Sequence, residues 1–169
     1  MPLDIDESTK VFIRDHRVAR LATGDDTGQP SVVPICYAFD GERFYVALDE
    51  KPKSVGDDEL KRVRNIRTNP RVALVIDDYS EDWAMLAYVL VTGRAEIISG
   101  SESALEHSRA VELLRTKYSQ YRVMAIDRRP MIKITASRIK LWAASENGVQ
   151  NDQKNSIRGA NRPSEHKLE

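Results

Sequence analysis

The residues best suited to binding chemistry are five cations gathered within eleven consecutive positions. The stretch reads Lys61-Arg62-Val63-Arg64-Asn65-Ile66-Arg67-Thr68-Asn69-Pro70-Arg71, in a chain whose 26 basic and 26 acidic residues cancel. The positive charge is therefore concentrated here and not spread evenly. Lysine and arginine side chains bind phosphate groups through charge-assisted hydrogen bonds. The run predicts a site for a ligand that carries a phosphate.

The spacing within this run predicts a short helix with two different faces. Leu60, Val63 and Ile66 recur at helical intervals and form an apolar face. The opposite face carries the polar side chains of Lys61, Arg64, Asn65 and Thr68. Pro70 ends the helix, because the residue before a proline avoids the α region. We therefore expect a basic helix that packs beside a sheet.

The charged loop from Asp49 to Glu59, just before this helix, leaves two interpretations open. Lys51 and Lys53 add two cations there and could complete a basic pocket with the helix. The loop also supplies Asp57, Asp58 and Glu59 as partners for surface salt bridges, so the basic helix could equally be a solvated face. Charge and spacing alone do not separate these interpretations.

The composition narrows the class of protein. A length of 169 residues predicts one domain with a substantial core. The balanced charge argues against a nucleic-acid-binding protein. The single cysteine, Cys36, excludes an internal disulfide, and we expect no metal centre from three scattered histidines, which are His16, His107 and His166. The acidic start and the absence of a long apolar run predict a cytoplasmic protein without a membrane segment.

The hydrophobic pattern predicts a mainly antiparallel sheet with two or three outer helices. The predicted strands are Arg20–Thr23, Gln29–Phe39, Phe44–Leu48, Arg71–Asp78, Ala87–Ile98 and Met131–Ala143. Besides the basic helix, the predicted helices are Asp6–Ala19, with a cap at Ser8 or Thr9, and Ser101–Tyr118. These elements indicate an α+β, mainly β domain built on a closed or nearly closed barrel.

Two local signals and one boundary refine this fold. Asp40-Gly41 predicts a hairpin between the second and third strands, and Gly93 predicts a bend or bulge inside a long strand. The residues from Glu146 to Glu169 include no aromatic side chain and almost no aliphatic ones. Such a segment cannot bury enough apolar surface to fold alone. We therefore expect a domain over residues 1–145 and a flexible polar tail over 146–169.

The sequence gives little support for any other catalytic or ligand-binding site. The chain contains no Gly-x-Gly-x-x-Gly sequence and no Walker-type loop, and nothing indicates a serine triad. Trp83 stands in an acidic loop, where an aromatic side chain could cover a flat ring, contact a partner subunit or simply fill a local part of the core. The basic helix is therefore the main candidate site, and no catalytic residue is predicted.

The order of several motifs resembles that of the pyridoxamine 5'-phosphate oxidase-like group of split β-barrel proteins, and within it the deazaflavin-dependent class. The motifs are Thr23, Gly28-Gln29-Pro30, Pro34, Asp40-Gly41-x-x-Phe44-Tyr45-Val46, Lys61-Arg62-x-Arg64-Asn65-Ile66-x-x-Asn69-Pro70-Arg71-Val72 and Tyr79-x-Glu81-Asp82-Trp83. The resemblance covers residues 11–143. It implies an FMN-binding split barrel, a homodimer, and cofactor sites lined by both chains.

The resemblance also implies roles for individual residues. Arg62 would bind the phosphate of FMN or of the deazaflavin coenzyme F-420, with Lys61 beside it. The family has a lysine at the place of Arg62, and arginine keeps the charge but changes its geometry to a fork. Trp83 would reach across the dimer. The implied cofactor-binding residues are Val33, Pro34, Tyr45 and Ala47 along the ring and ribityl chain, then Lys51, Lys53, Lys61, Arg62, Asn65 and Trp83.

The function expected from the resemblance is that of an oxidoreductase which moves a hydride to or from a small organic substrate. Oxidation of vitamin B6 is disfavoured, because the chain lacks the Arg-x-x-Leu-Leu-Lys strand and the carboxy-terminal arginine-rich motif of the true oxidases. The alternative is a non-catalytic flavin- or haem-binding carrier or sensor on the same fold. A haem site is weakened by the lack of a well-placed histidine.

Overall fold

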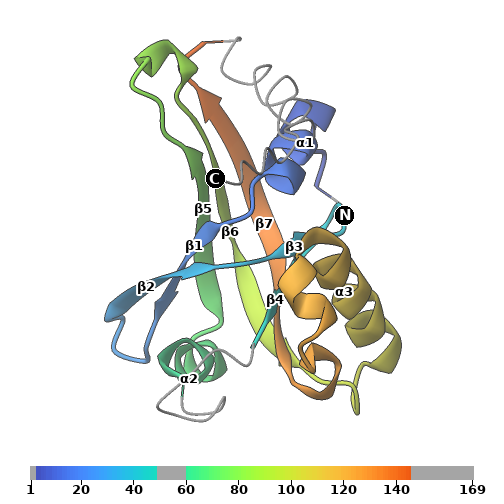
Figure 1. The fold of residues 1–169 in the computed structure, drawn as a ribbon. Coiled ribbons are helices and arrows are strands. Elements are labelled where there is room, and N and C mark those ends of the chain that lie inside the picture. Colours follow the sequence, from blue (N-terminus) through green and yellow to red (C-terminus); the bar gives the residue numbers. More distant parts are fainter. Residues whose placement is uncertain (1–2, 49–59, 146–169) are drawn as a thin grey trace, which may run out of the picture.

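A computed structural model describes residues 3–48 and 60–145 of the chain (Figure 1). Lys51, Lys53 and the predicted tail lie outside the described residues, so the expectations placed on them remain predictions. The helices are α1 (Glu7–Asp15), α2 (Lys61–Thr68) and α3 (Ala104–Lys117), with short 3₁₀ turns η2 (Trp83–Met85), η3 (Ser119–Arg122) and η4 (Ile126–Arg128). The strands are β1 (Ala19–Gly24), β2 (Pro30–Ile35), β3 (Ala38–Phe39), β4 (Arg43–Ala47), β5 (Arg71–Asp78), β6 (Ala87–Ile98) and β7 (Met131–Ala143).

The seven strands form one curled antiparallel sheet in the order β2-β1-β5-β6-β7-β4-β3. The sheet bends into a half-barrel, and the ends of β5, β6 and β7 extend beyond it as a long arm (Figure 1). This architecture confirms the predicted split β-barrel with outer helices. The predicted bounds of β6 and β7 agree with the structure, and Ala38 and Phe39 pair with Tyr45 and Phe44 as the hairpin signal indicated.

The predicted strand Gln29–Phe39 is wrong in one respect, because it is interrupted at Cys36 and Tyr37. The Tyr37 backbone N–H donates to the Tyr118 hydroxyl at 3.0 Å, and that hydroxyl lies 2.9 Å from the Tyr37 carbonyl oxygen. The Tyr37 side chain in turn donates to the Ile13 carbonyl at 2.6 Å. These bonds replace a strand ladder, so the chain forms the separate strands β2 and β3 at opposite edges of the sheet.

Helix α1 is shorter than predicted and begins with a different cap. The Asp6 carboxylate accepts the Thr9 backbone N–H at 2.8 Å and the Thr9 hydroxyl at 2.8 Å. Hydrogen bonds from Ser8 and Thr9 lower the Asp6 pKa to about 2. The helix ends at Asp15, and Ala19 already belongs to β1. Ser8 and Thr9 therefore support the Asp6 cap and do not act as the cap themselves.

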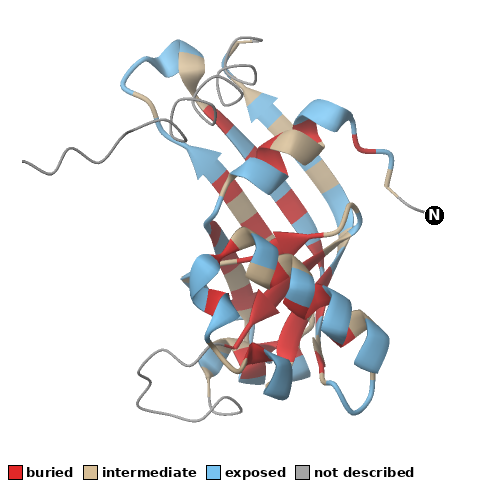
Figure 2. Ribbon diagram, turned by 45° about the vertical axis from the view of Figure 1, so that its right-hand side comes forward, coloured by how far each residue is buried: buried red, intermediate tan, exposed pale blue. Residues whose placement is uncertain are grey.

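Two apolar clusters hold the domain together, and the buried residues are red in Figure 2. The larger cluster fills the curl of the sheet beneath α1 and α2, and it includes Leu21, Phe44 and Leu74. The smaller cluster lies between α3 and the strands β3 and β4, where Leu114 packs near Tyr45 and Ala47. Each cluster covers one side of β4, since alternate residues of a strand face opposite sides.

A bulge interrupts the longest strand pair, as Gly93 predicted. The register between β6 and β7 shifts between Thr92 and Gly93, and the Ser137 hydroxyl donates to the Thr92 carbonyl at 3.0 Å. A Cβ atom on Gly93 would lie 2.3 Å from the Thr135 carbonyl oxygen. Only glycine fits this close approach, and on β7 the bulge lies just beyond Thr135, where the pairing with β4 ends.

Candidate functional site

Helix α2 forms over the predicted run, but it turns a different face to the core. Val63 and Ile66 are buried as expected. Asn65 is also buried, with 3% of its surface exposed, and therefore does not lie on the solvent-facing polar side. Its side-chain amide donates to the Thr23 hydroxyl of β1 at 2.9 Å. The prediction missed this because helical spacing identifies apolar positions only, whereas an asparagine with a buried partner joins the inner face.

The turn between β1 and β2 closes against the end of α2. The Asp25 carboxylate accepts the Thr27 hydroxyl at 2.7 Å and the Gln29 backbone N–H at 2.9 Å. These hydrogen bonds, with a smaller contribution from the charge of Lys61, lower the Asp25 pKa. The Asn69 amide reaches the Asp25 carbonyl at 3.4 Å. The helix is thus attached to the sheet by polar bonds near both Asn65 and Asn69.

Arg62 is the unusual residue of this helix. Its Nε atom is buried and has no hydrogen-bond partner among the described residues. A buried donor without an acceptor costs about 1–3 kcal/mol, so such groups are rare in folded proteins. The guanidinium group is a planar fork that matches the oxygens of a phosphate. Arg62 therefore has an unfilled donor of the type that an anionic ligand satisfies.

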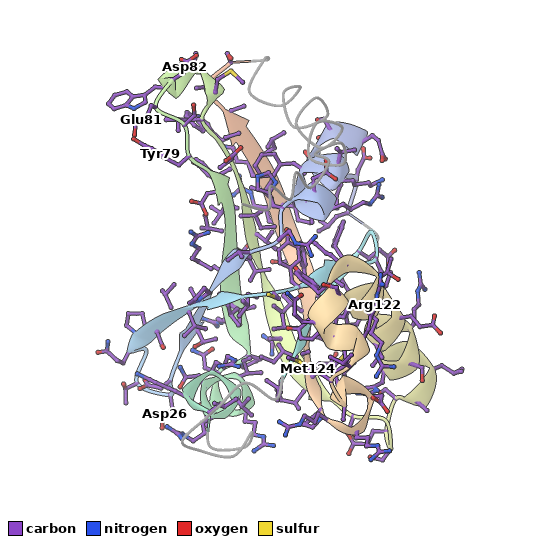
Figure 3. All side chains as sticks on the ribbon, in the orientation of Figure 1. Asp26, Tyr79, Glu81, Asp82, Arg122 and Met124 are labelled. Atoms are coloured by element: carbon purple, nitrogen blue, oxygen red, sulfur yellow. The ribbon has the colours of Figure 1, made fainter. Side chains whose placement is uncertain are left out.

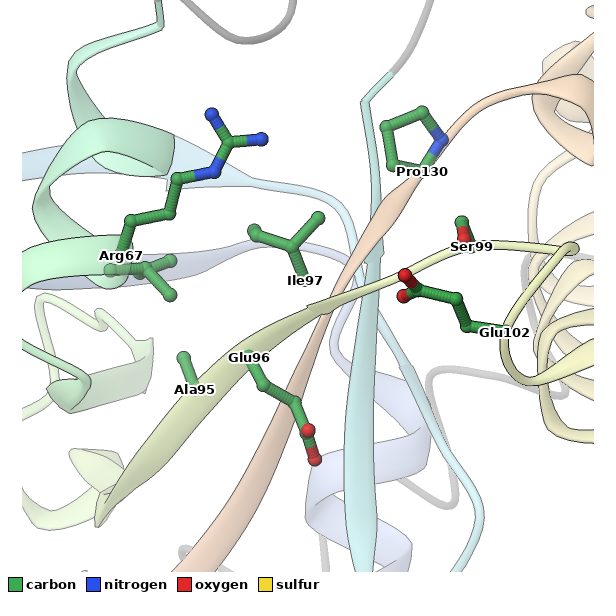
Figure 4. A pocket seen from close by; sticks show the side chains of 8 residues that line it. Arg67, Ala95, Glu96, Ile97, Ser99, Glu102 and Pro130 are labelled. Atoms are coloured by element: carbon green, nitrogen blue, oxygen red, sulfur yellow. The ribbon is translucent and has the colours of Figure 1, made fainter.

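An open cavity of about 510 Å³ lies beside α2 (Figure 4). Arg67 lies on one side of it, Ser99 and Glu102 lie on the other, and Ile97 of β6 stands between them. Cavities of this size hold small organic ligands. Ile66 also lines the cavity, whereas Arg62, four residues earlier on the same helix, is not among the residues that line it.

The cavity has a mixed charge. Glu96 lines it but forms an ion pair with Lys133 at 2.7 Å, whereas Arg67 and Glu102 face the hollow from α2 and from the segment before α3. Arg67 was recognised in the sequence as one cation of the basic run, but no sequence pattern indicated Glu96, Ser99 or Glu102. The curl of the sheet brings these residues close to α2. The spacing of residues along the chain does not indicate such a contact.

The structure does not bring together the four residues expected along a cofactor ring. Val33 and Pro34 lie on the edge strand β2, where Val33 is half-buried and Pro34 is exposed. Tyr45 and Ala47 are buried on β4 in the smaller cluster. The Tyr45 hydroxyl donates towards Glu106 at 3.0 Å, and burial followed by this bond raises the Tyr45 pKa. The ring-binding roles remain predictions, and burial counts against Tyr45 and Ala47.

Trp83 lies far from α2 within the same chain. It follows Asp82 at the end of the arm, which is the opposite end of the molecule from α2 and Asp26 (Figure 3). Its side chain is 71% exposed. Trp83 and α2 can therefore meet only if two chains associate, and the role of Trp83 across a dimer remains a prediction.

The two described histidines are both engaged within the protein. His107 is buried and its Nε2 atom lies 2.7 Å from the Arg129 carbonyl oxygen. The His16 Nδ1 atom lies 2.8 Å from the Phe12 carbonyl, and its ring stacks on Phe12. Within the described ranges, no group of three or more metal-binding side chains is gathered at one place. No helix there is long and apolar enough to cross a bilayer.

Comparison by sequence finds one family and a related reductase. A family model described as pyridoxamine 5'-phosphate oxidase matches residues 5–143. A 5a,11a-dehydrotetracycline/5a,11a-dehydrooxytetracycline reductase of Streptomyces rimosus is 29% identical over 117 residues, which span 68% of this chain and 78% of the reductase. Almost all of the described structure thus falls within one family model.

Comparison with solved structures finds the same fold in proteins of different activity. A conserved hypothetical protein of Mycobacterium tuberculosis superimposes with a TM-score of 0.66 at 22% identity, over 88% of this chain and 92% of that one. The haem storage protein of Vibrio cholerae gives 0.61 at 14% identity, over 85% and 95%. An F420 reductase gives 0.57 at 21% identity, over 80% and 98%. At these identities the likeness concerns the fold alone.

Proposed function

The chain belongs to the pyridoxamine 5'-phosphate oxidase family, and on this premise we propose that it is a flavin- or deazaflavin-dependent oxidoreductase. The proposed cofactor is FMN or coenzyme F-420, and the proposed substrate is a small organic molecule. The related tetracycline reductase and the F420 reductase with the same fold support this reaction class. The cytoplasmic location expected from the sequence remains part of the proposal.

The observation that carries the proposal is the unpartnered Nε atom of Arg62. It lies on the helix that holds the Arg-Asn-Ile-x-x-Asn-Pro-Arg motif, beside a cavity large enough for a small organic ligand. A phosphate at this place would accept the free donor and remove the cost of burying it. The residues present therefore fit a phosphate-bearing cofactor.

Each residue of the site has a distinct task in this proposal. The Arg62 guanidinium binds the phosphate, and exposed Lys61 adds a second positive charge one residue away. Asn65 holds the helix at a fixed position by its bond to Thr23, so the charge is placed before the ligand arrives. The cofactor, when bound, supplies the hydride chemistry. The protein supplies orientation, charge and a shaped cavity, which agrees with the absence of a predicted acid-base pair.

We propose that two copies of the chain associate through the arm. Aromatic and aliphatic side chains are exposed there, namely Tyr79, Trp83, Tyr88, Leu90 and Trp142. Tyr88 and Trp142 stack with their ring centroids 5.3 Å apart. Exposed aromatic side chains of this kind are enriched at protein interfaces. Sedimentation velocity should show a species of twice the chain mass, and a monomer at micromolar concentration would contradict this part of the proposal.

The cofactor is identified by titrating the purified full chain separately with FMN, coenzyme F-420 and haem. We expect saturable binding of FMN or F-420, measured by quenching of their own fluorescence. Retention of FMN would give a yellow protein, whereas preference for F-420 would leave the purified protein colourless. Binding of haem alone would replace the oxidoreductase with the carrier alternative. If neither flavin-type cofactor binds at micromolar concentration, the proposed function is wrong.

A further inference from the structure

The last residue of α3 carries a second buried nitrogen without a partner. The Nζ atom of Lys117 is buried and has no hydrogen-bond acceptor among the described residues. It lies over the face of the Tyr37 ring, 3.9 Å from the centroid, and 5.7 Å from the centroid of Tyr118. Contact with an aromatic face attracts the ammonium charge but leaves its N–H donors without acceptors.

The surroundings of Lys117 do not neutralise it. Burial, followed by the nearby charge of Arg17, lowers the Lys117 pKa to about 8. The Tyr118 hydroxyl accepts the Tyr37 backbone N–H at 3.0 Å and donates to the Arg17 carbonyl at 2.7 Å, and it makes no hydrogen bond with the Lys117 Nζ atom. Asp15 and Cys36 act on Lys117 only through space and do not contact it as acceptors.

Lys117 lines a cavity of about 380 Å³ between α1, β3 and α3. Two further cations line it, Arg14 of α1 and Arg109 of α3. The cavity is also lined by the apolar residues Ala38, Phe39 and Leu113. The pocket thus combines positive charge with an apolar wall. Ligand pockets are mostly apolar with a few polar or charged groups, and positive groups favour an anionic ligand.

The one carboxylate in the lining is already occupied. One oxygen of the Asp40 carboxylate accepts the backbone N–H groups of Glu42 at 2.9 Å and Arg43 at 2.8 Å, and the other lies 3.2 Å from the Tyr45 hydroxyl oxygen. Arg14 also pairs with Glu7 at 3.0 Å, on the exposed side of α1. The charge that faces the cavity is therefore positive on balance.

We propose that this cavity binds a small organic anion, a carboxylate or a phosphate ester with a short apolar part, and that the buried charge of Lys117 attracts it. The Lys117 Nζ atom is itself covered and lies over the ring of Tyr37, which does not line the cavity, so its charge would attract the anion without a direct hydrogen bond. The apolar part of the anion would contact Phe39 and Leu113. Arg14 and Arg109 would contribute attraction from the rim. The site lies on the outer side of β3 and β4, away from α2, and does not depend on the proposed redox function.

The test uses the full chain carrying Arg62→Ala, which removes the anion site proposed on α2. Propionate and inorganic phosphate are titrated separately, and the backbone amides are followed by NMR. We expect saturable shifts of residues 38–40 and 113–117 with at least one probe. The probe that binds more tightly distinguishes a carboxylate ligand from a phosphate. If neither probe produces saturable shifts around this cavity, the proposal is wrong.

Substitution separates binding from folding. Lys117→Met should weaken the binding of the probe by about tenfold or more, because the buried charge is lost. Its melting temperature should be no lower than that of the parent, since the substitution removes an unpartnered charge. Lys140→Met, an exposed lysine on β7, is the matched control and should bind as the parent does. Equal affinity in the Lys117 and Lys140 variants would overturn the proposal. If the Lys117 variant does not fold, the presence or absence of saturable amide shifts in the parent shows whether the cavity binds the anion.

Discussion

Helix α2 and the end of helix α3 share one unusual property and differ in how they can use it. Each buries a cationic nitrogen that lacks a hydrogen-bond partner among the described residues, Arg62 Nε in one and Lys117 Nζ in the other. Arginine keeps its charge at every ordinary pH, whereas a lysine can lose its proton when buried. The site proposed on α2 would therefore keep its positive charge at every ordinary pH. The Lys117 site changes its charge within the range where proteins work.

The first prediction tests whether Arg62 is a ligand-binding group. Arg62→Ala should weaken cofactor binding by about 1.5–3 kcal/mol, because a charge-assisted contact to phosphate is lost. Fluorescence titration with the cofactor that binds the parent measures the change. Arg64→Ala removes an equal charge from the exposed side of the same helix and should have a much smaller effect. Unchanged affinity in the Arg62 variant would remove that residue from the site.

The second prediction concerns the stability of the α2 attachment. Asn65→Ala should lower the free energy of unfolding by about 1–3 kcal/mol, because the buried Thr23 hydroxyl loses its partner and a small cavity forms. Urea denaturation measures the change. If the site needs a fixed helix, cofactor affinity should fall as well, while Arg64→Ala should leave the stability nearly unchanged. A full-stability Asn65 variant would show that the bond does not hold the helix.

The third prediction exploits the proton on Lys117. Lys117→Met should raise the free energy of unfolding by about 1–2 kcal/mol at pH 7, since the folded state disfavours the charged amine. Below pH 8 both states carry the proton, so the cost is fully present. Between pH 8 and about 10.5 the folded state loses its proton first, and the wild type gains stability as pH rises.

Chemical denaturation at pH 7 and at pH 10 checks this difference. The gap between Lys117→Met and the wild type should be largest at pH 7 and should shrink towards pH 10. The exposed Lys140→Met variant should show no such trend. A gap that is constant with pH would mean that the Lys117 ammonium is well solvated or paired.

The smallest effect is expected at the start of α1, the helix that carries Arg14 to the Lys117 cavity. Asp6→Ala should cost about 1 kcal/mol, because the Thr9 backbone N–H loses its cap. Since the folded pKa of Asp6 is lowered to about 2, this contribution is present above about pH 4 and is lost as the pH falls towards 2. Thermal unfolding should show a clearly larger difference at pH 7 than at pH 2.5.

The fold was more predictable from the sequence than the sites. The alternation in Ala87–Ile98 and Met131–Ala143, the Asp40-Gly41 turn and the basic helix depend on local spacing, and local spacing is visible in the sequence. The division of β2 from β3 depends on Tyr118, which lies 81 residues beyond Tyr37. No sequence pattern around residue 37 indicates that Tyr118 is its hydrogen-bond partner.

The candidate sites divide in the same way. The cations of α2 were found because they are consecutive, but Asn65 was placed on the wrong face because its partner Thr23 lies on another strand. The cavity around Lys117 is assembled from α1, β3 and α3, and each segment alone looks like an ordinary surface. The site residues Val33, Pro34 and Trp83 remain predictions that a complex with a cofactor would test.

The bulge at Gly93 has a consequence for how related sequences can be compared. On β7 the inward side chains are Ile132, Ile134 and Ala136 before the bulge, but Ile139, Leu141 and Ala143 after it. Even-numbered positions thus give way to odd-numbered ones, and the unpaired Ser137 is the residue that changes the phase. In a relative that lacks one residue at this point, the side chains in the rest of the strand would face the opposite side of the sheet. An alignment that places a gap elsewhere in β7 would therefore equate core positions with surface ones.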